Sequence, residues 1–179
     1  MKTLGKGSIA SVMKGALAVT WWALWAALAG LVLAALSFAA LLALIAADVL
    51  DAAILAGRGG AYDIPALLIG AVVIGGGLVI VGRLRKLFDS FTSGEPFRRE
   101  NAGHLRVIWI AMLTIELSRY ALLGLTGALT AAFGPPEGAT ANFAVQVDLS
   151  NWMAILILIV LAEVFREGAR LKAEQELTI

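Results

Sequence analysis

The chain has 179 residues, of which 60% are hydrophobic and only 15% are charged, and its formal net charge is +1. This apolar fraction exceeds what a water-soluble core of that size requires, so the composition predicts an integral membrane protein. The sequence has no cysteine and a single histidine, which excludes disulfides, thiolate metal sites and multi-histidine clusters. We therefore expect no metal site and no cofactor.

The first predicted membrane span covers residues 15–47. These 33 positions contain no charged residue, and about 20 apolar residues are enough for a helix to cross the hydrocarbon core. Trp21, Trp22 and Trp25 follow Lys14, which is typical of the aromatic belt at a membrane surface. A cleaved signal peptide is the alternative, but the apolar regions of such peptides run for only about 7 to 15 residues.

The second predicted span covers residues 64–82 and follows a charged segment that we expect to be an external loop ending at Asp63. Pro65 is expected in the first helical turn, where a missing N–H costs nothing. The span is rich in glycine, which lets helices approach one another closely in lipid. It lacks the Lys-Ser/Thr pair of a phosphate-binding loop. The glycines are Gly70, Gly75, Gly76, Gly77 and Gly82.

Residues 83–106 are basic and predict a helical hairpin outside the bilayer. Its first half has the apolar spacing of one helix face, so the second helix is expected to continue beyond the membrane. That face consists of Leu84, Leu87, Phe88 and Phe91. Pro96 favours a break before a new helix that starts around Arg98. The expected inner face of this new helix consists of Phe97, Asn101, Leu105 and Ile108.

The third predicted span covers residues 107–133 and ends at the Gly-Pro-Pro-Glu-Gly segment 134–138. The fourth covers residues 149–165, close to the lower length limit of about 17 residues. A charged tail, residues 166–179, follows, and the end of the span and the tail together form an amphipathic helix. The expected inner face of this helix consists of Leu161, Val164, Phe165, Gly168 and Leu171. These elements predict an all-α fold, an integral membrane four-helix bundle with cytoplasmic helical extensions, formed by one membrane domain of residues 1–179.

The basic residues predict the orientation of this bundle. Three lie in the N-terminal segment, six in the hairpin and three in the tail, whereas the two remaining loops together contain only Arg58. Positively charged loops are retained in the cytoplasm, so both termini and the hairpin are expected there.

Glu116 and Arg119 lie one helical turn apart inside the third span. An isolated charge at that depth costs upward of about 3 kcal/mol, so both side chains are expected to face the bundle interior or a wet cavity. Two interpretations remain open, a structural ion pair that fixes helix packing and a site for a proton, ion or ligand. The first two spans offer no charge at a matching depth, which disfavours a channel or carrier.

No other group of residues indicates catalysis, and we expect the protein not to be an enzyme. His104 has Glu100 nearby but no nucleophile on the same element. Asp48 and Asp51 are too few oxygen ligands for a cation. The basic residues lie beside the bilayer with one aromatic tip residue, Phe97, so anionic lipid is a nearer partner for them than nucleic acid, and we expect no direct nucleic-acid binding.

The hairpin and the tail together resemble the bacterial domain-of-unknown-function 2975 membrane protein family. The motifs that carry the resemblance are Gly94-Glu95-Pro96-Phe97, Glu100-Asn101 and Leu105-Arg106, with the tail residues Phe165, Gly168, Leu171 and 174–179. Arg98 departs from the capping Ser or Thr expected in many relatives. The resemblance implies a multi-pass protein of the bacterial inner (cytoplasmic) membrane that has no established activity. Its members are often encoded beside small helix-turn-helix regulators, which is an association and not a mechanism.

Two functions follow as hypotheses, with the lipid bilayer as a partner in both. The first is a non-enzymatic membrane partner or sensor that acts through its hairpin and tail on a cytoplasmic protein such as a transcription regulator. Its candidate docking residues are Pro96, Phe97, Arg98, Arg99, Glu100, Asn101 and Arg106. The second is a small-solute or ion transporter, or a ligand sensor, built around Glu116 and Arg119. A homo-oligomer formed through the glycine faces is compatible with either.

Overall fold

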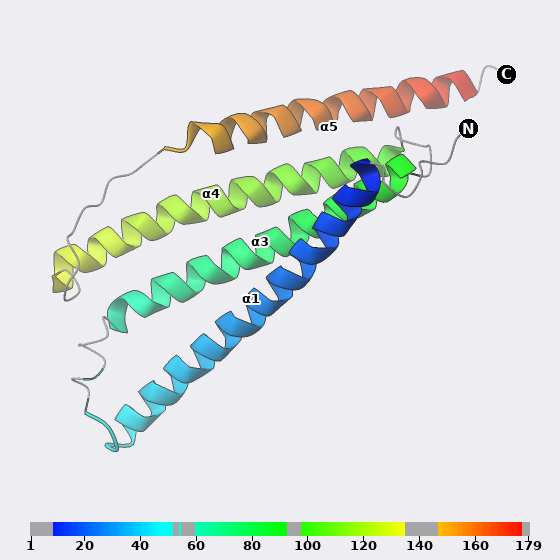
Figure 1. Cartoon of the computed structure of the whole chain (residues 1–179). Helices are drawn as coiled ribbons and strands as arrows, with labels where there is room; N and C mark the ends of the chain where they lie inside the picture. The colour runs from blue at the N-terminus through cyan, green and yellow to red at the C-terminus, as the bar shows by residue number, and fades with distance from the viewer. Residues whose placement is uncertain (1–8, 52–53, 55–59, 93–97, 135–146, 177–179) are drawn as a thin grey trace. The chain divides into compact units, whose positions relative to one another are not determined.

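The computed structural model describes residues 9–51, 54, 60–92, 98–134 and 147–176. Four long helices occupy these ranges: α1 (Ile9–Ala46), α3 (Gly60–Thr92), α4 (Arg99–Phe133) and α5 (Leu149–Glu176) (Figure 1). None of the described residues lies in a strand. The predicted all-α four-helix bundle is therefore confirmed.

All four helices are long and apolar enough to cross a membrane. Large apolar side chains on their surfaces are exposed, for example Trp22 at 72%, Leu33 at 67% and Val160 at 63%. So much contiguous apolar surface would drive association in water, whereas lipid solvates it. The chain is a multi-pass membrane protein.

Helix α3 is continuous from Gly60 to Thr92, so the predicted continuation of the second helix beyond residue 82 is confirmed. Its start differs from the prediction, because the first turn contains Asp63, a residue predicted to end the preceding loop. A carboxylate there interacts favourably with the positive end of the helix dipole. Pro65 consequently lies inside the helix and not in its first turn, so its predicted position was wrong.

The boundaries of α4 follow from local hydrogen bonds. At its start, the carbonyl oxygen of Arg98 accepts the N–H of Asn101 at 3.0 Å, which agrees with a helix predicted to begin around Arg98. At its end, Gly134 has a φ of +84°. Its N–H donates to the carbonyl oxygen of Thr130 at 2.9 Å. Glycine adopts this left-handed conformation without steric cost, so it ends the helix where the sequence predicted.

Helix α5 begins with an N-cap. The Asp148 carboxylate accepts the backbone N–H of Ser150 at 3.1 Å and of Asn151 at 3.4 Å. This satisfies two amide groups that have no partner within the helix. The helix then continues without a break beyond its apolar run to Glu176.

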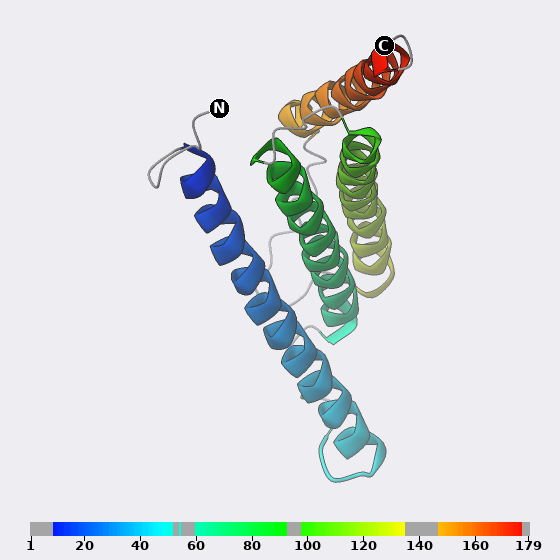
Figure 2. The ribbon, with the colours of Figure 1, turned by 90° about the vertical axis from the view of Figure 1, so that its right-hand side faces the viewer.

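The chain divides into two compact units that alternate along the sequence. Unit 1 comprises Met1–Trp25, Gly76–Thr114 and Asp148–Ile179, and unit 2 comprises Ala26–Gly75 and Ile115–Val147. Helices α1, α3 and α4 contribute to both units, and α5 belongs to unit 1 alone. Within unit 2, the three helix portions lie side by side with α3 in the middle (Figures 1 and 2).

The core lies mainly in unit 1. All the buried leucine, isoleucine, valine and alanine side chains of the described residues belong to it: Leu17, Val81, Leu87, Leu105, Ile108, Ile155 and Ala169. These side chains come from all four helices, so each helix contributes to the core of this unit. The apolar side chains on the outward faces of the helices are exposed and are expected to contact lipid.

Glycines of α3 receive side chains of α1, as their predicted packing role requires. A Cβ atom added at Gly70, in unit 2, would lie 2.9 Å from the Leu31 side chain. In unit 1, a Cβ at Gly77 would lie 3.2 Å from Leu24. A Cβ at Gly75 would meet nothing within 4 Å, so this glycine has no such neighbour.

Candidate functional site

A buried polar contact joins α3 to α4 at the hairpin end of unit 1. The Asn101 side-chain amide donates to the Ser90 hydroxyl at 2.6 Å, and this hydroxyl donates to the Leu87 carbonyl at 2.9 Å. Asn101 is only 1% exposed, and Leu105 and Ile108 on the same face are each 2% exposed, so the predicted inner face of α4 is confirmed at these three residues. Asn101 therefore holds two helices together and presents no docking surface.

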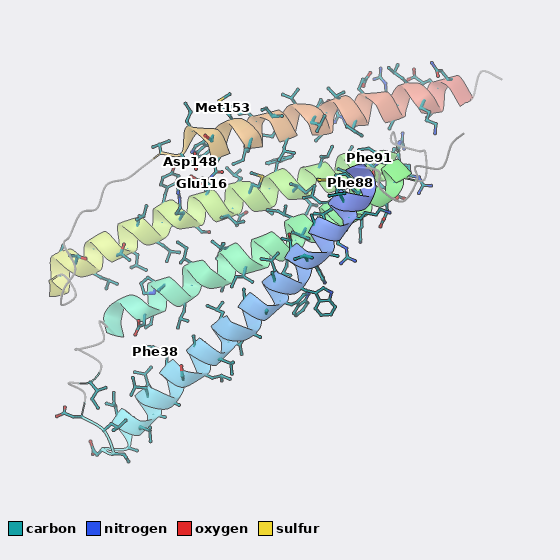
Figure 3. All side chains as sticks on the ribbon, in the orientation of Figure 1. Phe38, Phe88, Phe91, Glu116, Asp148 and Met153 are labelled. Atoms are coloured by element: carbon teal, nitrogen blue, oxygen red, sulfur yellow. The ribbon has the colours of Figure 1, made fainter. Side chains whose placement is uncertain are left out.

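Helix α5 packs on the same end of unit 1, and its predicted inner face is confirmed at Phe165 but not at three other residues. The Phe165 ring lies 6.1 Å from the Phe91 ring, and Ala169 is 5% exposed. Figure 3 shows Phe91 close to Phe88 near the end of α3, where their rings meet edge to face. The predicted face is wrong at Leu161, Val164 and Leu171, which are 38%, 54% and 50% exposed. Within the predicted span, large apolar side chains such as Leu161 and Val164 can face lipid at no cost, whereas the small Ala169 permits close helix approach.

Charged and aromatic side chains connect the ends of α1, α3 and α4 in unit 1. Lys14 forms an ion pair with Asp89 at 2.9 Å, and the Arg85 guanidinium lies 5.5 Å from the Trp21 ring centre. Arg83 contacts the His104 ring nitrogen at 3.4 Å. Lys14 and Asp89 are largely exposed, so their pairing adds little stability on its own.

A groove of about 770 Å³ runs between α4 and α5 in unit 1. Four of its lining residues are arginines and two are glutamates, which leaves a net positive charge. The α4 side is formed by Arg99, Ala102, Gly103, Arg106 and Trp109, and the α5 side by Ile159, Ala162, Glu163, Arg166, Glu167 and Arg170. We call this feature the arginine groove. The sequence does not reveal it, because it depends on which face of α5 turns toward α4.

Four of the other predicted docking residues lie in or beside this groove. Arg98 and Glu100 are exposed but do not line it, whereas Arg99 and Arg106 do. Pro96 and Phe97 fall outside the described residues. The structure thus brings two of the predicted residues to one concave surface, leaves two beside it and buries Asn101.

In unit 2, the intramembrane pair forms as its spacing predicted. Arg119 donates to the Glu116 carboxylate at 2.8 Å, and its guanidinium lies 5.4 Å from the ring centre of Tyr120. Glu116, which is labelled in Figure 3, is only 3% exposed, whereas the Arg119 side chain is 35% exposed. A buried carboxylate in an apolar medium requires such a charged donor, so this pair satisfies it.

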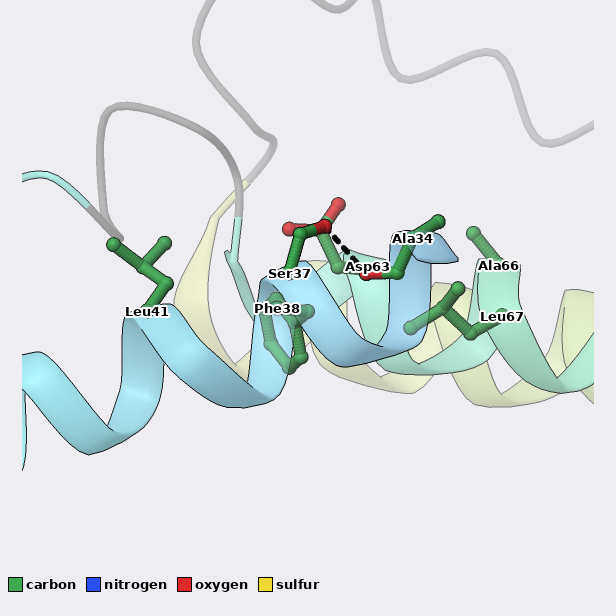
Figure 4. A pocket seen from close by; sticks show the side chains of 7 residues that line it. All are labelled: Ala34, Ser37, Phe38, Leu41, Asp63, Ala66 and Leu67. Carbon is green, nitrogen blue, oxygen red and sulfur yellow. Dashed lines mark hydrogen bonds between the residues drawn. The ribbon is translucent and has the colours of Figure 1, made fainter. Parts of the chain in front are cut away.

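Unit 2 also contains a cavity of about 310 Å³ between α1 and α3. Its polar lining consists of Ser37 and Asp63, and Phe38 lies beside them (Figure 4). The Ser37 hydroxyl donates to the Ala34 carbonyl at 2.8 Å, so its hydrogen atom is already used within α1. Across the described residues, no cluster of three or more His, Cys, Asp or Glu side chains could hold a metal ion.

A family model described as "Protein of unknown function (DUF2975)" matches residues 59–179, more than half of the chain. The chain belongs to this family. The match spans α3, α4 and α5 and therefore includes both sides of the arginine groove. No curated protein and no solved structure matches the chain.

Proposed function

We propose that the protein is a non-enzymatic membrane partner or sensor that binds a cytoplasmic protein, such as a transcription regulator, through the ends of α4 and α5. It would lie in the inner membrane of a bacterium with both termini in the cytoplasm. The orientation rests on the distribution of Lys and Arg, twelve of which lie in the N-terminal segment, the hairpin and the tail, against one in the other loops.

One observation carries the proposal: the polar helix ends of unit 1 are packed together instead of standing apart. The Ser90–Asn101 hydrogen bond and the Phe91–Phe165 contact hold α3, α4 and α5 at one end. Rigid presentation lowers the entropy cost of binding, so a packed end suits recognition better than three separate helix ends.

The exposed surface at this end has the mixed character of a protein interface. On α5, Leu171 is 50% exposed and is flanked by the charged residues Arg170 and Lys172. On α4, Arg98 and Glu100 are exposed. An apolar side chain among charges offers both contact area and electrostatic selection of a partner.

Charge reversal at this surface provides the test. The full chain would be purified from native membranes as wild type and as the double variant Arg98→Glu/Lys172→Glu, and co-purifying proteins would be identified by mass spectrometry. We expect a cytoplasmic protein with the wild type and its loss from the variant. Arg58→Glu is the control, because it reverses a cation in a loop that is predicted to lie on the opposite, external side of the membrane. An identical set of proteins from all three chains would contradict the proposal.

The buried carboxylate of Glu116 favours one second candidate, a transporter or ligand sensor built around Glu116 and Arg119. Under this alternative, Glu116→Gln should abolish flux or ligand response while the protein accumulates normally. Neither Glu116 nor Arg119 lines the arginine groove or the cavity beside Asp63. A variant that fails to accumulate would assign the pair a structural role.

A further inference from the structure

We propose that the arginine groove between α4 and α5 binds an anionic phospholipid, with the lipid phosphate at Arg99 and Arg106 and an acyl chain along Trp109 and Ile159. The proposal concerns a lipid site within unit 1. It does not depend on the cytoplasmic partner proposed above.

The charges of the groove indicate an anionic ligand. On the α5 side, Arg166 pairs with Glu163 and Arg170 pairs with Glu167 at 2.8 Å, so these four residues largely neutralise one another. On the α4 side, Arg99 and Arg106 form no ion pair with any described residue. Two exposed guanidinium groups therefore remain to receive an anion, and guanidinium matches phosphate oxygens with paired hydrogen bonds.

The spacing along α4 leaves room for that anion. Arg99 and Arg106 lie two helical turns apart on one face, about 10 Å along the axis. Gly103 lies between them and also lines the groove. A Cβ atom added at Gly103 would meet nothing within 4 Å, so the floor of the groove is open at this position. A phosphate and its glycerol fit between two such cations.

The groove is also polar at one end and apolar at the other. Helices α4 and α5 run in opposite directions (Figure 1), so Arg99 and Arg170 lie at one end and Trp109 and Ile159 at the other. Free phosphate would use only the polar end. A phospholipid uses both, and basic grooves between membrane helices at the headgroup level are typical sites for anionic lipids.

Lipid binding by defined variants tests this assignment. The full chain is purified in detergent and delipidated, and binding of dioleoyl phosphatidylglycerol and dioleoyl phosphatidylcholine is compared by native mass spectrometry. Because each of the two arginines favours an anionic lipid, we expect the wild type to bind phosphatidylglycerol about 30-fold more tightly than phosphatidylcholine. Arg99→Gln/Arg106→Gln should abolish this preference. Arg98→Gln, which removes one neighbouring cation outside the groove, should change it by about 2-fold or less.

A second variant separates a shaped site from general surface charge. Gly103→Leu fills the groove while every arginine remains, and leucine suits a helix better than glycine, so folding is preserved. We expect it to weaken phosphatidylglycerol binding about as much as the double variant. Size-exclusion chromatography and thermal unfolding confirm that each chain is folded, and the arginine variants decide the question if Gly103→Leu does not fold.

Four results would overturn the proposal. These are equal binding of the two lipids by the wild type, an unchanged preference in Arg99→Gln/Arg106→Gln, full binding by a folded Gly103→Leu chain, and displacement of phosphatidylglycerol by equimolar inorganic phosphate. If the groove variants lose a co-purifying protein but keep the lipid preference, the groove is a protein site. The lipid assignment then fails while the proposed function stands.

Discussion

Units 1 and 2 are built largely from the same three helices, yet they are stabilised differently. Unit 1 has a buried apolar core, the Ser90–Asn101 contact and a fourth helix. Unit 2 has the buried Glu116 paired with Arg119, one cavity with a carboxylate, and a glycine contact between α1 and α3. Unit 1 contains most of the charged residues and yet has the larger buried apolar core. Apolar content does not decide which parts of a membrane protein become closely packed, because lipid solvates apolar side chains as well as protein does.

The largest expected effect is in unit 2, where one charge depends on one partner. Arg119→Leu leaves the buried Glu116 carboxylate without its guanidinium donor, which should destabilise the protein by about 3 kcal/mol. The double variant Arg119→Leu/Glu116→Gln also removes the negative charge of Glu116 and should recover most of this stability. Thermal unfolding of the purified chains in detergent measures both. Equal loss in the single and double variants would contradict an ion pair that stabilises unit 2.

The next effect concerns the polar contact of unit 1. Asn101→Ala removes the donor to Ser90 and leaves a small cavity, with an expected cost of about 2 kcal/mol in the free energy of unfolding. A double-mutant cycle with Ser90→Ala should give a coupling of about 1 kcal/mol, since interhelical hydrogen bonds in membrane proteins contribute modestly. Additive effects of the two substitutions would mean that the 2.6 Å contact contributes no stability.

Two glycines of α3, Gly70 and Gly75, test how much the contact between α1 and α3 stabilises unit 2. Gly70→Ala forces the Leu31 side chain to move, since the new Cβ would lie 2.9 Å from it, and should leave the protein about 1 kcal/mol less stable than Gly75→Ala does. Gly75→Ala, on the same helix and with open space around it, should be neutral or slightly stabilising. Thermal unfolding of both variants measures the difference. If Gly70→Ala unfolds no earlier than Gly75→Ala, the α1–α3 contact does not limit stability.

The smallest effect is expected at the Lys14–Asp89 ion pair of unit 1, whose side chains are 45% and 68% exposed. Lys14→Ala should change the free energy of unfolding by about 0.5 kcal/mol or less, because water and salt screen exposed pairs. Unfolding measured at low and at high ionic strength checks this assignment. A loss comparable to that of Asn101→Ala would show that surface charge, and not the buried contact, holds this end of unit 1.

The sequence by itself determined the four helices, their main boundaries and one ion pair. Continuous apolar runs can satisfy their backbone groups in lipid only as helices, and Gly134 ends α4 by local chemistry. The spacing of Glu116 and Arg119 places them one turn apart whatever surrounds them. The inner face of α4 was predicted at Asn101, Leu105 and Ile108 because these residues are spaced at i, i+4 and i+7, which places them on one side of a helix.

Only the tertiary structure decided which faces meet. The predicted inner face of α5 was wrong at Leu161, Val164 and Leu171, the contact of Asn101 with Ser90 was not foreseen, and the arginine groove arises only once α4 and α5 are side by side. In water, apolar residues mark the inside of a helix bundle. In a bilayer both sides of a helix face an apolar environment, so the choice falls to small residues, shape and a few polar contacts between segments far apart in the chain.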